Sequence, residues 1–174
     1  MSRIIVVVIG LVNLLGEATW LHRVAIFDIV PNLSMILIVF WGILQGSEHG
    51  RRLGLVVGLL QDILFCRVIG FYGLVYYLIG HISGFFNRDF DKRHFILSLT
   101  VVAAADLAYG ILHYLIYCFF QGNLDIGYYF MRRVLPEVCY TALISVPLYP
   151  LARLLSRAIN GIDRWLQSGK DKER

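Results

Sequence analysis

Residues 42–84 read GILQGSEHGRRLGLVVGLLQDILFCRVIGFYGLVYYLIGHISG, and this stretch decides the fold. Apolar runs alternate in it with short polar breaks, and seven of its nine glycines fall in two runs with a spacing of four residues. They are Gly42, Gly46, Gly50, Gly54 and Gly58, followed later by Gly80 and Gly84. Small residues at this interval let the backbones of neighbouring membrane helices come close together. The stretch therefore predicts closely packed membrane helices, with contacts at Gly54, Gly58, Gly80 and Gly84.

The composition of the 174-residue chain favours the same class. Apolar residues make up 58% of it and charged residues 16%, with a mean hydropathy of +0.68. A soluble domain is about 45–50% apolar and about 25% charged. A soluble globular protein, a disordered chain and a nucleic-acid-binding domain are therefore excluded. The net charge of +4 comes from Lys and Arg placed between apolar blocks, where they set orientation in a lipid bilayer.

Six apolar blocks predict an all-α integral membrane protein with six transmembrane helices. They cover residues 4–21, 33–47, 53–67, 70–86, 95–120 and 134–155. We expect polar residues 45–52 to form a turn at the membrane surface, because each charge at membrane depth costs about 2.5–3.5 kcal/mol. Pro147 and Pro150 predict a kink in the last helix. Residues 1–157 then form one transmembrane domain, and residues 158–174 form a basic cytoplasmic tail.

The distribution of basic residues predicts the orientation of the chain. With six helices, both termini lie on one side of the membrane. Twelve of the 16 Lys and Arg residues fall on that side, and the other four fall opposite. Basic residues collect on the cytoplasmic side of membrane proteins. We therefore expect both termini in the cytoplasm.

Four acidic residues fall inside or near the apolar blocks. They are Glu17, Asp62, Asp106 and Glu137, and His113 follows Asp106 by two helical turns. Ionisable groups at membrane depth usually face the interior of the bundle, a polar cavity or a partner. They could form a polar pocket or a docking site in the outer half of the membrane, or simply hydrogen bonds between helices. The spacing does not predict a metal site or a cofactor, and no catalytic motif occurs.

Several motifs in the first half of the chain resemble the bacterial rod shape-determining protein MreD family. They are Pro31-Asn32-Leu33, the glycine repeat leading into Gly58-Leu59-Leu60-Gln61-Asp62, and Gly70-Phe71-x-Gly73-Leu74 followed by Tyr77-x2-Gly80. The motifs cover residues 31–84, and length, helix count and basic C-terminus are similar along nearly the whole chain. The positions that match the family pattern are Pro31, Gly54, Gly58, Asp62 and Gly70.

The resemblance implies a non-enzymatic scaffold of the cell-elongation machinery, in the bacterial cytoplasmic membrane. Such a protein works beside MreC and, through it, with MreB and the SEDS glycosyltransferase–transpeptidase pair that extends peptidoglycan. The resemblance also implies a fold similar to the substrate-binding subunits of energy-coupling-factor transporters. Two alternatives remain open: a vitamin-binding subunit of such a transporter, and a membrane enzyme acting on lipid-linked precursors. A copurifying small ligand would favour the first of these over a scaffold.

Overall fold

The computed structural model describes residues 3–24, 29–65, 70–87, 95–121, 127 and 130–171. Within these residues the chain forms six α-helices and one π-helical turn. They are α1 (Arg3–Val24), α2 (Leu33–Gln45), α3 (Ser47–Phe65), α4 (Phe71–Phe85), α5 (Phe95–Gln121), η1 (Phe130–Val134) and α7 (Leu135–Asp171). The all-helical class predicted from the sequence is confirmed.

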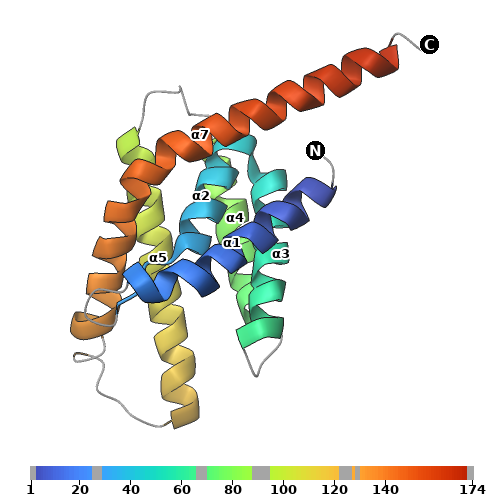
Figure 1. The fold of residues 1–174 in the computed structure, drawn as a ribbon. Coiled ribbons are helices and arrows are strands. Elements are labelled where there is room, and N and C mark those ends of the chain that lie inside the picture. Colours follow the sequence, from blue (N-terminus) through green and yellow to red (C-terminus); the bar gives the residue numbers. More distant parts are fainter. Residues whose placement is uncertain are drawn as a thin grey trace.

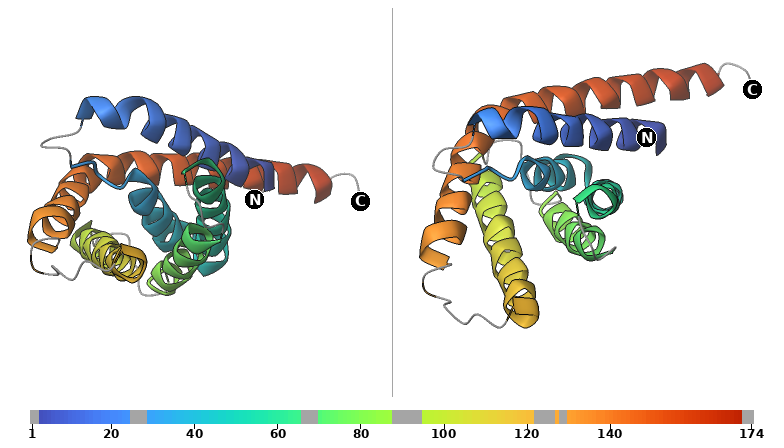
Figure 2. Two further views of the ribbon diagram at one scale, coloured as in Figure 1. Left: turned by 90° about the horizontal axis from the view of Figure 1, so that it is seen from below. Right: turned by 60° about the horizontal axis from the view of Figure 1, so that its bottom comes forward.

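The helices form a bundle around α2. Figure 1 shows α2, α3, α4, α5 and the first half of α7 running alongside one another, and α2 contacts all of the other four. Helix α1 crosses this bundle obliquely and packs on α3 and α2 (Figures 1 and 2). Nine of the thirteen residues of α2 are buried, since this helix is apolar on every side. The hydrophobic core therefore follows α2, with Phe40, Trp41 and Met35 among its largest side chains.

The described residues have an apolar exterior and a partly polar interior. Large apolar side chains point outward from five helices, including Leu15 (66% exposed), Ile63 (68%), Ile96 (78%) and Leu143 (68%). The buried polar side chains are Ser34, Asp62, Ser83, Ser98, Asp106, Thr141, Ser145 and Ser156. A water-soluble protein places charged and polar groups outside. The observed arrangement suits a protein surrounded by lipid.

Within the part of the chain that the structure describes, two helical segments are long and apolar enough to cross a membrane, judged by length and composition. They are Phe95–Leu115 in α5 and Phe130–Ala158, which covers η1 and the first part of α7. In the most apolar stretch of each segment, only 22% (α5) and 17% (η1 and α7) is buried inside the protein. These segments therefore differ from the buried core helix of a soluble protein, and most of their surface faces outward.

Helices α3 and α4 approach each other backbone to backbone. A Cβ atom added at Gly58 would lie 2.6 Å from the Cα of Gly73, and one at Gly80 would lie 2.6 Å from the carbonyl carbon of Gly50. A Cβ at Gly54 would overlap the backbone of Tyr76, and one at Gly84 would overlap Ser47. No side chain fits at these contacts, because real Cβ atoms do not come this close to a neighbouring backbone.

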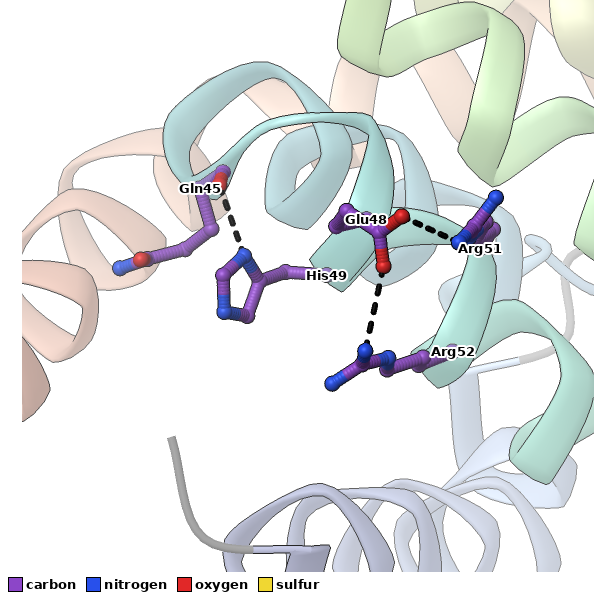
Figure 3. Close-up of polar contacts among 5 residues, drawn as sticks. All are labelled: Gln45, Glu48, His49, Arg51 and Arg52. Atoms are coloured by element: carbon purple, nitrogen blue, oxygen red, sulfur yellow. Dashed lines mark hydrogen bonds and ion pairs between the residues drawn. The ribbon is translucent and has the colours of Figure 1, made fainter.

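The turn between α2 and α3 is shorter than the sequence predicts. Helix α2 ends at Gln45, Gly46 alone separates the helices, and α3 begins at Ser47, so the expected turn over residues 45–52 is wrong. Gly46 has φ +89°, a backbone conformation that glycine adopts without strain. Glu48 forms ion pairs with Arg51 and Arg52, three and four residues later (Figure 3). Pairs at this spacing stabilise a helix, which explains why a polar segment begins α3.

Helix α7 continues well beyond the predicted end of the last membrane helix. It runs over 37 residues without a break, so residues 158–171 continue this helix. Figure 1 shows that α7 bends part-way along and that its C-terminal half leaves the bundle sideways. Pro147 and Pro150 lie inside the helix. Each proline removes a backbone N–H donor and crowds the preceding turn, which accounts for the bend.

Candidate functional site: a polar network around the start of α2

Asp62, near the end of α3, caps the start of α4. Its Oδ2 atom accepts hydrogen bonds from the backbone N–H groups of Gly70 at 3.0 Å and Gly73 at 2.9 Å, and its Oδ1 atom accepts one from Tyr72 at 3.0 Å. The first N–H groups of a helix have no partner within the helix, and a carboxylate stabilises the positive end of the helix dipole. Asp62 is fully buried, so these three bonds replace the water that its charge would otherwise need.

Asn32 joins three helices at the N-terminus of α2. Its side-chain oxygen accepts a hydrogen bond from the N–H of Met35 at 3.0 Å, which is a helix N-cap. Its side-chain Nδ2 donates to Asp106 Oδ1 of α5 at 3.2 Å. Its backbone N–H donates to Thr141 Oγ1 of α7, also at 3.2 Å. The residue therefore fixes α5 and α7 against the start of the central helix.

Ser34 joins the same end of α2 to α1. The N–H of Ser34 donates to Glu17 Oε1 at 2.6 Å, and Asn13 Nδ2 donates to Ser34 Oγ at 2.7 Å. Gln61 Nε2 of α3 donates to the second carboxylate oxygen of Glu17 at 3.3 Å. The positive end of α2 thus has Glu17 on one side and Asp106 on the other, as the helix dipole favours.

Aromatic side chains fill the contact between α4 and α5. The rings of Tyr72 and Tyr76 lie 5.8 Å and 6.0 Å from the ring of Tyr109, measured between centroids. His113 lies one turn further along α5, with its ring 6.0 Å from that of Tyr109. These rings separate the two helix backbones and line the interior beside Asp106, which lies one turn before Tyr109 on the same helix.

The predicted acidic residues do not form a single group of side chains. Asp62 is engaged by α4, Glu17 by Ser34 and Gln61, and Asp106 by Asn32. Glu137 is half-buried and precedes Thr141 by one turn, on the face of α7 that meets α2. Asp106 is 2% exposed, and its Oδ2 atom is buried without a hydrogen-bond partner.

The sequence interpretation missed most residues that hold the network together. The sequence analysis names Asn32 and Gln61 only within family motifs, and it does not name Ser34 or Thr141. Asn32 carried a usable signal, because an asparagine directly before an apolar helix is a typical N-cap. Pro31 is buried just before it and Gly70, with φ +106°, directly precedes α4, so both family-motif turn residues lie at helix starts. Nothing in the local sequence indicated Thr141, since it contacts Asn32 across 109 residues.

The arrangement defines a class of protein before any comparison is made. An all-helical bundle with an apolar exterior and hydrogen-bonded polar groups inside is an integral membrane protein. Among the described residues, no three His, Cys, Asp or Glu side chains come together as a metal site requires.

Comparison with known families then identifies the chain more closely. The family model described as rod shape-determining protein MreD matches residues 1–159, and the chain therefore belongs to the MreD family. This membership gives the protein a role in rod shape determination and places it among membrane proteins. Neither a curated protein nor a solved structure matches the chain.

Proposed function

We propose that this protein is a non-enzymatic membrane scaffold of the cell-elongation machinery, supporting lateral peptidoglycan synthesis through MreC. In this proposal the chain crosses the cytoplasmic membrane six times, with both termini in the cytoplasm. Contacts with MreB and with the SEDS glycosyltransferase–transpeptidase pair are indirect. Membership of the MreD family supports the role, and the basic residues of the sequence support the orientation.

The observation that carries the proposal is the use of the buried polar groups. The hydrogen bonds of Asp62 join α3 to α4, those of Glu17 join α1 to α2 and α3, and those of Asn32 join α2 to α5 and α7. A scaffold needs such an interior, because its outer faces must hold a constant geometry for partners. The exposed apolar side chains on α1, α3, α4, α5 and α7 supply those faces to lipid and to partner helices.

Copurification with MreC tests the proposal. Tagged protein extracted from the membrane should bring down MreC in a fixed ratio. A tryptophan scan then separates partner faces from lipid faces, using exposed positions such as Leu74 and Leu78 on α4 and Leu143 on α7. We expect at least one exposed face at which tryptophan lowers MreC recovery while protein abundance stays normal. Absence of MreC from the purified protein would contradict the scaffold role.

One observation favours the small-molecule-binding alternative. Asp106 Oδ2 and Gln61 Oε1 are buried and have no hydrogen-bond partner, and each could accept a bond from a bound ligand. A vitamin-binding subunit would retain its ligand through purification and would copurify with an ATPase-coupled membrane partner. Mass spectrometry of the purified protein distinguishes the two functions. A stoichiometric ligand that Asp106→Asn releases would favour the transporter subunit.

A further inference from the structure

The C-terminal half of α7 is much longer than the bundle needs. The helix has 37 residues, which corresponds to about 55 Å at 1.5 Å per residue. A helix crosses the hydrocarbon of a bilayer with about 20 residues. Residues 151–171 follow the bend and extend sideways past the bundle (Figure 1). This segment, which we name the surface arm, has a long side without described contacts to the bundle.

The surface arm has two faces of opposite character. Leu151, Leu154 and Leu155 are 64%, 66% and 41% exposed, and helical periodicity puts positions 158, 162, 165 and 166 on the same side. The same periodicity puts positions 153, 157 and 164, which are arginines in the sequence, on the opposite side of the helix. The segment contains four Lys or Arg residues and two Asp residues. An apolar face with leucine and tryptophan opposite a basic face is typical of a helix that lies in a membrane surface.

The beginning of the surface arm is fixed to the α2–α3 end of the bundle. Gln45, the last residue of α2, donates from its side chain to Ser156 Oγ at 2.7 Å. Gln45 and Arg51 are partly exposed and Glu48 and Arg52 are exposed, all around the junction of α2 and α3 drawn in Figure 3. Ser156 is buried by this contact, on a side of α7 between the leucines and the arginines. The bundle therefore sets the rotation of the arm about its axis.

We propose that the surface arm lies in the plane of the membrane surface and binds anionic phospholipids. Its leucine face enters the acyl-chain boundary, and Arg153, Arg157 and Arg164 contact phosphate headgroups from above. In the proposed orientation of the chain, the arm lies on the cytoplasmic leaflet. Lipid binding by the arm does not depend on that orientation.

Charge and continuity favour a lipid surface over a second protein helix as the occupant. The exposed apolar side chains run from Leu143 and Val146, in the span, to Leu151 and Leu154 in the arm, without a polar gap on the outside. The surface that faces lipid in the membrane therefore continues directly into the arm. Each Lys or Arg near an anionic membrane surface is attracted to it, so three arginines on one face favour negatively charged lipids.

Spin labels on the two faces of the arm test the proposal in the full-length protein. Single cysteines replace Leu155 and Ile162 on the apolar face or Asn160 and Gln167 on the polar face, in a chain whose native cysteines are alanine. The protein is placed in nanodiscs of phosphatidylcholine alone or with phosphatidylglycerol. Power saturation then compares access of oxygen, which dissolves in lipid, with access of a water-soluble nickel chelate.

We expect apolar-face labels to be open to oxygen and shielded from nickel, and polar-face labels to show the reverse. The contrast should be larger with phosphatidylglycerol. In the variant combining Arg153→Gln, Arg157→Gln and Arg164→Gln, the gain from phosphatidylglycerol should be lost. Equal nickel access on both faces in both lipids would show a helix in water and overturn the proposal. Shielding of the apolar-face labels from both oxygen and nickel, whatever the lipid charge, would indicate a protein contact and also overturn the proposal.

A matched control removes three positive charges outside the arm, at positions predicted to lie on the same side of the membrane. Arg88→Gln, Lys92→Gln and Arg93→Gln together lower the net charge equally and should keep the phosphatidylglycerol effect. If this control loses the effect as well, net charge is responsible and the assignment to the arm is overturned. The measurement needs no MreC and works on either leaflet. Its failure would leave the scaffold role intact, and failure of MreC copurification would leave the lipid contact intact.

Discussion

Asp62 Oδ2 lies 2.9 Å from the backbone nitrogen of Gly73, so a carboxylate of one helix caps the start of the next helix in the chain. The two elements are also joined by backbone contact at Gly58 and Gly73. A buried acid and a close glycine contact thus both hold the end of α3 against the start of α4. The family motif that contains Asp62, Gly58 and Gly70 has a structural explanation there, namely the fixed meeting of α3 with α4.

Removing the acid should destabilise the protein. Asp62→Leu leaves the N–H groups of Gly70, Tyr72 and Gly73 without an acceptor, and each buried unpaired donor costs about 1–3 kcal/mol. Asp62→Asn keeps one acceptor oxygen and should be milder. Thermal unfolding of detergent-extracted protein measures both. A Leu variant with wild-type stability but without cell-shape complementation would instead show that Asp62 binds a partner.

Alanine at the helix contact should be poorly tolerated. Gly58→Ala and Gly54→Ala force α3 away from α4, and overpacking of this kind costs about 1–3 kcal/mol. Gly16→Ala is the matched control, because nothing lies within 4 Å of an added Cβ there. Alanine in place of a helical glycine should be neutral or stabilising by up to about 1 kcal/mol. Similar melting temperatures for all three variants would mean that the α3–α4 contact is not close.

The bond between Asn32 and Asp106 should give a measurable coupling energy. Each alanine substitution removes one partner of the 3.2 Å hydrogen bond, and residues in one network couple by about 0.5–3 kcal/mol. A double-mutant cycle on unfolding free energies isolates this term. Asn32→Ala combined with Ser156→Ala serves as the control, and the effects of that pair should add. Additive effects for Asn32 and Asp106 would show that the bond contributes nothing to stability.

The proposed orientation, with both termini in the cytoplasm, predicts which reporter fusions are active. A reporter that works only outside the cytoplasm should be silent when fused after Arg174 and active when inserted at Asn123. The reason is the excess of Lys and Arg on the side of the termini. Western blots must show equal amounts of the two fusions. An active reporter after Arg174 would rule out an even number of spans with cytoplasmic ends.

The fold class followed from composition and hydropathy, because lipid demands apolar helices whatever their arrangement. Local spacing also placed Gly54, Gly58, Gly80 and Gly84 on helices. It could not say which backbone each glycine meets, since Gly58 contacts Gly73 only after the chain has reversed direction. The turn over residues 45–52 was wrong for a local reason. Hydropathy treats Glu48, Arg51 and Arg52 as a break, whereas their pairing stabilises a helix.

The network was less predictable than the fold. That Asp62 and Asp106 need partners follows from the cost of burying a charge. The identity of the partners depends on distant parts of the chain, since Asn32 and Asp106 are 74 residues apart. For Asp62 the partners are backbone N–H groups at the start of α4, and no side-chain pattern reveals them. The pairing of α2 with α5 and α7 through one asparagine therefore required the structure.

The bonds of Glu17 bear on how the chain enters the membrane. Its acceptor oxygens are satisfied by residues 17 and 44 positions later, Ser34 and Gln61. If α1 is a membrane span, as the proposed topology has it, synthesis from the N-terminus delivers α1 to the insertion machinery before either donor exists. The carboxyl group then carries the insertion cost of an unpaired acid, about 2.5–3.5 kcal/mol at a helix centre. In the proposed six-span topology, the oblique seating of α1 on α2 and α3 is completed only after α3 has left the ribosome.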